Sequence, residues 1–313
     1  MNGGKVLSFS SSAKAELCQT RLENKASAVA EAYGVLLYCN TFSAKEIRII
    51  TASDEFGKRL PKLFKKAFDL NFDVLPDQAI GNSSKKSYVI NDPKKISAIF
   101  NSFDIDVDSV LSQHINRGII EEDNEKTAFL RGAFLAGGSC TDPLKNYHLE
   151  LCTAHYSVSR EAYSLLLEMD FSPKEANRSG THLVYFKKSE AIEDFFTRLG
   201  APVSAMDVMN AKVEKEMRNV INRKVNCDSA NADKIVAAAQ EQLNAIKFID
   251  REFGLESLPD KLHETALLRI TNPGASISDL AKLAIPPVSK SCLNHRLKKL
   301  VSLAEEKSSQ SNS

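Results

Sequence analysis

The residues best suited to chemistry form a basic stretch near the C-terminus. Between Ser289 and Leu303 there are lysines, an arginine and a histidine but no acidic residue. Lysine and serine side chains bond phosphate oxygens, whereas arginine and asparagine can bond base edges in bidentate fashion. Leu293, Leu297 and Leu300 recur at helical spacing, so they predict an apolar face toward a core. The candidate DNA-contacting residues are Ser289, Lys290, Ser291, Asn294, His295, Arg296, Lys298 and Lys299.

The elements before this helix are short and sharply separated. A helix over residues 261–270 is followed by the turn Asn272-Pro273-Gly274 and a short helix over residues 276–283. Ser276 and Asp279 have capping-box spacing, and a proline turn precedes Ser289. This order predicts a helix-turn-helix domain over residues 259–303, with its motif at about 275–308. The alternative is a three-helix structural cap whose basic face is merely solvated. The polar tail 304–313 is expected to be disordered.

A second basic segment spans residues 212–224. It has five basic residues against Glu214 and Glu216. A solvated helix surface and a set of phosphate contacts explain it equally well. The weaker DNA-binding candidates are therefore Lys212, Arg218, Arg223 and Lys224. The segment lies in a predicted helical linker, 205–258, with asparagine-rich turns in its middle and an amphipathic helix over residues 233–253.

Two helical segments carry strips of very small side chains. Alanine or glycine recurs every four residues in both, and a shift of 98 residues aligns Gly34 with Gly132. Such strips allow two helices to approach almost to backbone contact. The predicted packing residues are Ala30, Gly34, Ala128, Gly132 and Ala136.

The correspondence between the two halves extends beyond these helices. The strand pattern of residues 47–52 reappears at 149–154, including the Thr-Ala end, and each strand is followed by an amphipathic helix. A second strand and a closing helix follow in both halves. The ordered series predicts an internal duplication, with repeats at about 25–106 and 123–204 forming one domain, 25–204. A helical arm, 1–24, precedes it, with Ser10 or Ser11 as the expected N-cap of a helix over residues 13–22.

Bulk properties exclude several classes of protein. The chain has 313 residues, a net charge of +1 and 43% hydrophobic residues, as in an ordinary globular protein of two or three domains. No apolar run reaches the length of a membrane span, and six scattered cysteines without a CxxC pair indicate a reduced, cytoplasmic setting. His148, Cys152 and His155 lack a fourth ligand at suitable spacing, so no metal or cofactor is expected.

The segment Arg131–Gly138, together with the duplication, resembles the signature of the LAGLIDADG homing-endonuclease fold. With the helix-turn-helix and the run Ser289–Leu297, nearly the whole chain resembles the WhiA family. The resemblance implies an α+β fold: a duplicated αββαββα domain, whose signature helices pair at a pseudo-twofold axis beneath a saddle of two sheets, and an all-α helix-turn-helix domain.

The resemblance also implies where nuclease chemistry would lie. In the endonucleases each signature helix ends in an acidic residue that binds the metal, and the matching positions here are Cys39 and Gly137. Hard divalent cations need oxygen ligands, which neither residue supplies. The expected protein is therefore not an enzyme but a transcriptional regulator that binds double-stranded DNA, associates with the nucleoid and meets the transcription machinery or another regulator. The family is associated with cell division, chromosome segregation and, in sporulating relatives, sporulation.

Two alternatives stay open at this point. One is an active homing-type endonuclease that uses other carboxylates. The other is a protein-binding scaffold, since Glu150 on a saddle strand would repel phosphate.

Overall fold

A computed structural model describes residues 8–76, 85–105 and 113–311. Parts of three predicted segments, the arm, the first repeat and the tail, lie outside these residues. The chain divides into two compact units, Met1–Glu216 and Met217–Ser313.

The first unit contains the two predicted repeats. The first repeat comprises α2 (Lys25–Tyr38), β1 (Thr41–Phe42), β2 (Ile47–Thr51), α3 (Asp54–Phe68), β3 (Lys86–Ile90) and α4 (Pro93–Asn101). A short 3-10 helix (Arg117–Ile119) leads into the second. The second repeat comprises α5 (Asp123–Gly137), β4 (Gly138–Cys140), β5 (Leu149–Thr153), α6 (Tyr156–Glu168), β6 (Lys174–Arg178), β7 (Thr181–Phe186) and α7 (Ser189–Leu199).

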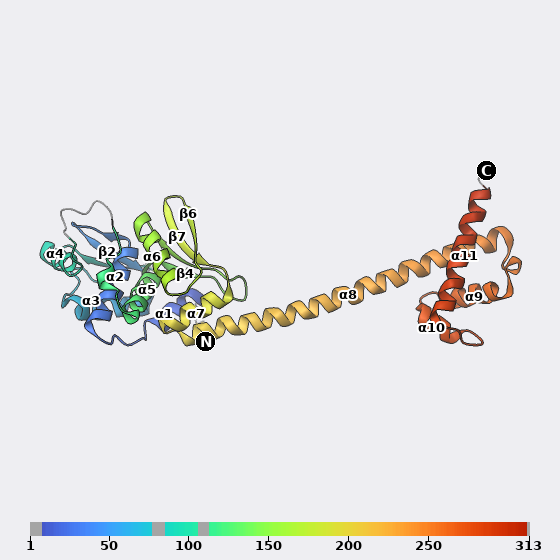
Figure 1. Ribbon diagram of the computed structural model, residues 1–313, viewed down its shortest axis with the longest axis horizontal. Coiled ribbons are helices and arrows are strands. Elements are labelled where there is room, and N and C mark those ends of the chain that lie inside the picture. Colours follow the sequence, from blue (N-terminus) through green and yellow to red (C-terminus); the bar gives the residue numbers. More distant parts are fainter. Residues whose placement is uncertain (1–7, 77–84, 106–112, 312–313) are drawn as a thin grey trace. The chain divides into compact units, whose positions relative to one another are not determined.

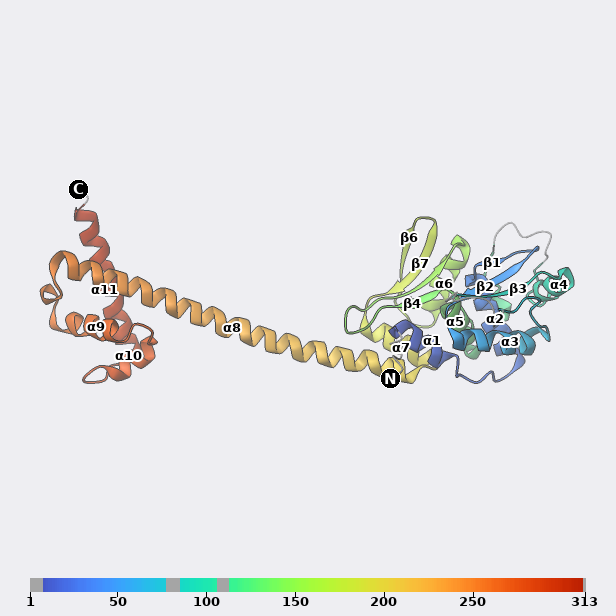
Figure 2. The same cartoon turned by 180° about the vertical axis from the view of Figure 1, so that it is seen from behind.

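The sheets of the two repeats have matching topologies. The antiparallel strand orders are β1-β2-β3 in one sheet and β4-β5-β7-β6 in the other. The place of β6 in the first repeat is taken by a single bridge between Val74 and Val89. Both sheets flank the central pair α2 and α5 (Figures 1 and 2). The predicted duplicated α+β fold is confirmed, and among the described residues of the first repeat this bridge is the counterpart of β6.

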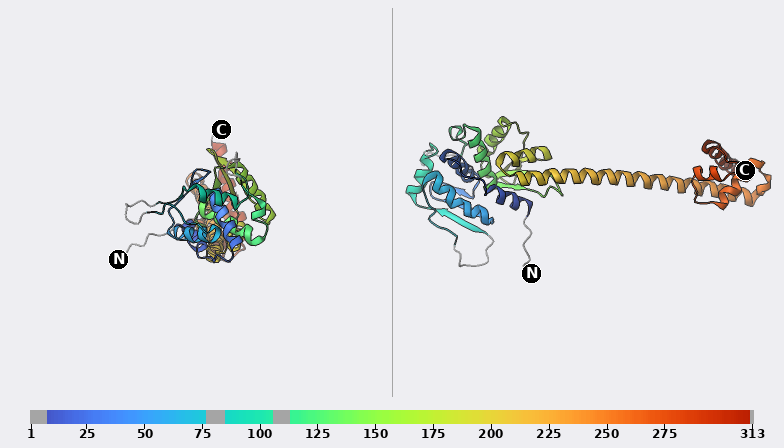
Figure 3. Two further views of the ribbon diagram at one scale, coloured as in Figure 1. Left: turned by 90° about the vertical axis from the view of Figure 1, so that its left-hand side faces the viewer. Right: turned by 90° about the horizontal axis from the view of Figure 1, so that it is seen from below.

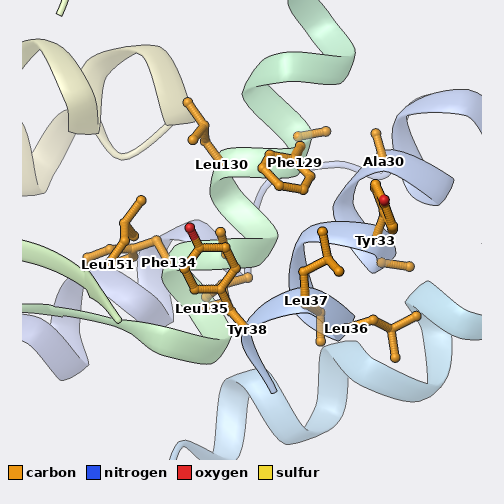
Figure 4. Close-up of a cluster of buried hydrophobic side chains, with 14 of the residues drawn as sticks. Ala30, Tyr33, Leu36, Leu37, Tyr38, Phe129, Leu130, Phe134, Leu135 and Leu151 are labelled. Carbon is orange, nitrogen blue, oxygen red and sulfur yellow. The ribbon is translucent and has the colours of Figure 1, made fainter. Parts of the chain in front are cut away.

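The central pair α2 and α5 packs at backbone distance. A Cβ added to Gly34 would lie 2.0 Å from the carbonyl oxygen of Phe129, and one added to Gly132 would lie 2.0 Å from that of Glu31. These contacts are reciprocal under the 98-residue shift, so the two helices meet about a pseudo-twofold axis. Ala30 and Ala128 are buried along the same seam, and Ala136 is partly buried. Large side chains such as Tyr33, Leu37 and Phe134 fill the core around it (Figure 4).

The N-terminal helix differs from its prediction. Helix α1 spans Phe9–Leu17 and is capped by Ser8, whose side chain accepts from the backbone N–H of Ser11. The expected helix over residues 13–22 was therefore placed too late, because both Ser10 and Ser11 lie inside the helix. Ala13 and Leu17 are buried in the core of the first unit.

Helix α8 (Pro202–Phe253) is one continuous helix of 52 residues (Figures 1 and 3). The asparagine-rich turns expected at Asn219, Asn222, Asn226 and Asn231 are absent from it. All four side chains are exposed, so none of these asparagines places a polar group in a core. Their modest helix propensity alone does not interrupt the helix. Glu16 of α1 caps the N-terminus of α8. Its carboxylate accepts hydrogen bonds from the backbone N–H groups of Val203 at 2.7 Å and Ser204 at 2.9 Å.

The second unit is built around the end of α8. It also contains a 3-10 turn (Leu255–Ser257), α9 (Asp260–Thr271), α10 (Ile277–Leu283) and α11 (Lys290–Ser311). Ile246 and Ile249 of α8 share one buried cluster with Leu280, Leu293 and Leu297. The unit therefore begins earlier in the chain than residue 259, where the sequence places the domain boundary. Helix α11 continues to Ser311, through most of the tail that was expected to be disordered.

Candidate nucleic-acid interface

The turn before α11 is fixed by local hydrogen bonds. Ser276 caps α10 by accepting from the N–H of Asp279 at 3.2 Å. Across the turn that follows α10, the Val288 N–H donates to the Ala281 carbonyl at 3.0 Å. Ser289 then accepts from the N–H of Cys292 at 3.1 Å and so caps α11. Three helices separated by short turns, with the last helix longest, form the expected helix-turn-helix.

One face of α11 is buried and the opposite face is basic. Leu293, Leu297 and Leu300 are buried against α9 and α10. The exposed side chains are those of Ser289, Lys290, Ser291, His295, Lys298 and Lys299. Residues 291, 295 and 298 follow each other at helical spacing, so they form one outward row along the helix.

Asn294 and Arg296 lie on the flanks of this row. Both are half-buried. Arg296 lines a hollow of about 900 Å³ between α9, the turn after α10 and α11, together with Asp260 and Glu264. These carboxylates weaken the case for Arg296 as a phosphate or base contact. The structure thus brings six of the eight candidates to the exposed surface and leaves two at its edges.

Arg269 was missed as a functional candidate because arginines are normally read as surface residues. Its side chain is only 1% exposed and donates to Gln242 of α8 at 3.0 Å and to the Ala275 carbonyl at 2.7 Å. Burial lowers the pKa of the guanidinium. Arg269 therefore ties α8 to the turn that precedes α10. Its helical spacing from the buried Leu262 and Ala266 was the signal that could have identified it.

The weaker candidates have different surroundings. Lys212 is paired with Glu190 at 2.5 Å, and this contact lowers the pKa of Glu190 to about 2. Arg218, Arg223 and Lys224 are exposed on α8. Lys212 thus already has an anionic partner.

The ends of the signature helices do not resemble a metal site. A Cβ on Gly137 would lie 2.5 Å from the Cys152 carbonyl oxygen and 2.9 Å from the ring of Tyr38, so the position has no room for a carboxylate. The Cys39 thiol donates to the carbonyls of Leu36 and Thr41, and burial raises its pKa to about 12. Within residues 8–76, 85–105 and 113–311, no group of three His, Cys, Asp or Glu side chains is arranged to hold a metal.

The saddle strands alternate as the sequence predicts. Ile47 and Leu149 are buried, whereas Arg48 is exposed and Glu150 half-buried on the other face. Burial opposes ionisation of Glu150, but hydrogen bonds from His148 and Ser139 hold its pKa below the usual value. Arg48 is occupied by Glu46 at 2.7 Å. At these two positions the face therefore offers a carboxylate and a paired arginine, while the exposed Lys174 and Arg178 of β6 lie on the same face as Glu150.

Hydropathy adds one further observation. None of the helices in the described part of the chain is both long and apolar enough to cross a membrane.

Taken together, these features define a class of protein: a two-repeat LAGLIDADG-type domain without the metal-binding carboxylates of the endonucleases, carried on the same chain as a helix-turn-helix. Family models agree in both parts. The WhiA LAGLIDADG-like domain matches residues 126–218 and the WhiA C-terminal HTH domain matches residues 221–304. The chain belongs to the WhiA family.

Relatives match over almost the full length. A protein of Clostridium botulinum named "Probable cell division protein WhiA" is 34% identical over 312 residues, covering 96% of this chain and 98% of the relative. A Clostridium perfringens protein of the same name is 33% identical over the same coverage. The crystal structure of full-length WhiA from Thermatoga maritima has the same fold, with a TM-score of 0.58 and 22% identity over 96% of this chain and 99% of that one.

Proposed function

We propose that this protein is a DNA-binding transcriptional regulator without nuclease activity. The observation that carries the proposal is the exposed basic face of α11, which has no acidic residue between Ser289 and Leu303 and is held by a packed helix-turn-helix core. On this face Lys290, Lys298 and Lys299 hold phosphates, while Ser291, Asn294 and His295 lie close enough to the row to meet base edges.

The first unit acts in this proposal as a scaffold. Gly137 and Cys39 supply no ligand for Mg²⁺, so the route to phosphodiester cleavage by two metals is missing at the expected place. Nicking of supercoiled plasmid by the purified protein in Mg²⁺ or Mn²⁺ would contradict this half of the proposal.

The cellular setting follows from the relatives. Because they are named as probable cell division proteins, we propose that DNA binding serves cell division, in the cytoplasm at the nucleoid. Roles in chromosome segregation and sporulation, and a partner in the transcription machinery or another regulator, follow from the family resemblance alone.

The test is a salt titration of DNA affinity with the full chain. Removing a phosphate contact should weaken binding to all sequences alike and shallow the plot of log K against log salt by about 0.9 per contact. We expect a slope about 2 units shallower for the Lys298→Ala, Lys299→Ala double variant. Fluorescence anisotropy on a genomic site recovered by footprinting, and on a scrambled duplex, measures both effects.

A matched control keeps the charge change and moves it off α11. Lys62 and Lys66 are two lysines of α3 in the first unit, and replacing both with alanine should leave the slope unchanged. Equal slopes for the wild type and the α11 double variant would overturn the assignment of α11. Truncation at residue 258 is a poorer test, because it strips Ile246 and Ile249 of their core partners.

A further inference from the structure

A polar cavity of about 400 Å³ lies in the first unit, at the N-terminal end of the α2/α5 pair. It is walled by the turn after α1, the first turns of α2 and α5, and the end of α7. Its volume lies within the range of small-molecule sites. The proposed DNA-binding function uses none of its residues.

Two arginines share one carboxylate at the wall of this cavity. Glu31 is 1% exposed and receives two hydrogen bonds from Arg59, at 2.6 and 2.8 Å, and one from Arg131 at 3.2 Å. Arg59 and Arg131 are themselves only 5% and 14% exposed. One carboxylate therefore serves two guanidinium groups, which leaves a net charge of +1 where solvent is largely excluded. An anion bound beside Arg131 would compensate it.

Arg131 has donors left for such an anion. Its Nε donates to the Leu199 carbonyl at 2.9 Å and its Nη1 to Glu31. An arginine side chain carries five N–H groups. Within the part of the chain that the structure describes, no protein atom accepts from Nη2, which lies at the cavity wall formed by Gly200.

Three more groups offer hydrogen bonds to the same space. Arg21 is exposed at the cavity and has neither an ion pair nor a hydrogen bond to any described residue. Ser27 of α2 and Thr127 of α5 also line it, and each carries a hydroxyl group. Glu23 is the one opposing carboxylate at the rim besides Glu31, among the described lining residues. Donors thus converge from three separate segments of the chain.

We propose that this cavity binds the phosphate group of a small phosphorylated molecule. A tetrahedral dianion presents several acceptor oxygens in different directions, which matches donors on Arg21, Arg131, Ser27 and Thr127 better than a planar carboxylate does. The bound phosphate would bridge both repeats and the end of α7, immediately before α8.

The experiment is isothermal titration calorimetry of the full chain, without DNA, at constant ionic strength set by sodium chloride. The probes are inorganic phosphate and glycerol 3-phosphate. Saturable binding of either probe supports the proposal. Tighter binding of the ester identifies a phosphorylated metabolite as the ligand, and equal binding identifies free phosphate.

Variants then test whether the binding measured by calorimetry takes place in this cavity. Arg21→Ala should weaken binding about tenfold or more, since it removes a charge-assisted hydrogen bond. Arg131→Lys should do the same, because lysine keeps the charge but loses the guanidinium fork. Arg178→Ala, at an exposed arginine outside the cavity, should leave affinity unchanged. The proposal would be overturned if both Arg21→Ala and Arg131→Lys bound the probe with unchanged affinity while their thermal midpoints showed folded protein. It would also be overturned if the wild type showed no saturable binding. Neither result bears on DNA binding by α11.

Discussion

One lysine of the first unit, Lys14, lies in surroundings that are unusual for a charged side chain. Lys14 of α1 is half-buried with its ammonium 5.6 Å from the centre of the Phe134 ring. In the described part of the chain it has no ion pair with a carboxylate. Burial lowers its pKa to about 8, while burial raises the pKa values of Cys18 and Cys152, which lie near it, to about 12 and 11. The protein thus carries a penalty for charging Lys14 at neutral pH.

The pH dependence of stability should reveal this penalty. Because the pKa of Lys14 is lower in the folded than in the unfolded chain, the unfolded chain binds more protons between about pH 8 and 10.5. The contribution of Lys14 to the free energy of unfolding of the first unit should therefore rise with pH in that window, whereas the raised pKa values of Cys18 and Cys152 lower the stability as pH rises above about 9. Lys14→Met should stabilise the unit at pH 7, and the difference in the free energy of unfolding between this variant and the wild type should shrink as pH rises from 8 to about 10.5. Urea unfolding at pH 7 to 10 measures both.

The control for Lys14→Met is Lys62→Met, at an exposed lysine of α3. It should shift neither the stability at pH 7 nor its pH dependence. A loss of stability at pH 7 in Lys14→Met larger than in this control would show that the ammonium is favourable where it lies.

Elements divide into those that the sequence defines locally and those that depend on distant contacts. Helix α2 begins at Lys25, where the predicted first repeat begins, because Asn24 caps it, and its small-residue strip can be recognised in the sequence. The start of α8 could not be predicted from its local sequence, because the side chain that caps it is Glu16, far earlier in the chain. The burial of Arg269 was equally hidden, because its acceptors come from α8 and a turn.

The closeness of α2 and α5 gives a prediction for their glycines. Gly34→Ala or Gly132→Ala would push a methyl group into a backbone carbonyl of the other helix. Overpacking of this kind costs about 1–3 kcal/mol, and more where the neighbour is backbone. Chemical denaturation of the full chain, followed by the first unit's transition, should show this loss in each variant.

Gly118→Ala provides a comparison in the same unit. A Cβ there would meet only side-chain oxygens, those of Asn116 at 3.4 Å and Glu121 at 4.0 Å. If Gly34→Ala and Gly132→Ala destabilised the unit no more than Gly118→Ala, the close packing of α2 on α5 would be refuted.

At the scale of the whole molecule, the sequence predicts both folds, but it places the boundary between them at residues 258/259, later than the structure does. Gly254 and Pro259 mark the end of a helix, which reads as the edge of a domain. The structure instead divides at Glu216 and Met217, and the end of α8 belongs to the second unit because Ile246 and Ile249 are buried in one cluster with side chains from α10 and α11. The glycine and proline that follow a helix do not show whether one face of that helix is buried against residues far along the chain.

Fragments should distinguish the two boundaries. A fragment of residues 217–313 should fold with a cooperative thermal transition. A fragment of residues 259–313 loses Ile246 and Ile249, each worth about 1.5–3 kcal/mol when buried, and also loses Gln242, the partner of Arg269. We expect it to lack cooperative melting by circular dichroism. Equal transitions in both fragments would favour the boundary at 258/259.

The reciprocity of Gly34 and Gly132 also bears on descent. Each repeat presents to the other the same surface that it receives, since Gly34 meets Phe129 and Gly132 meets Glu31. A single repeat with this helix would leave that surface bare and would have to associate with an identical copy, the arrangement of an isologous dimer. Joining two copies in one gene removed the requirement that they stay identical. The bridge at Val74 in place of a full strand, and Cys39 at the position that corresponds to Gly137 in the other repeat, record how far the halves have since diverged.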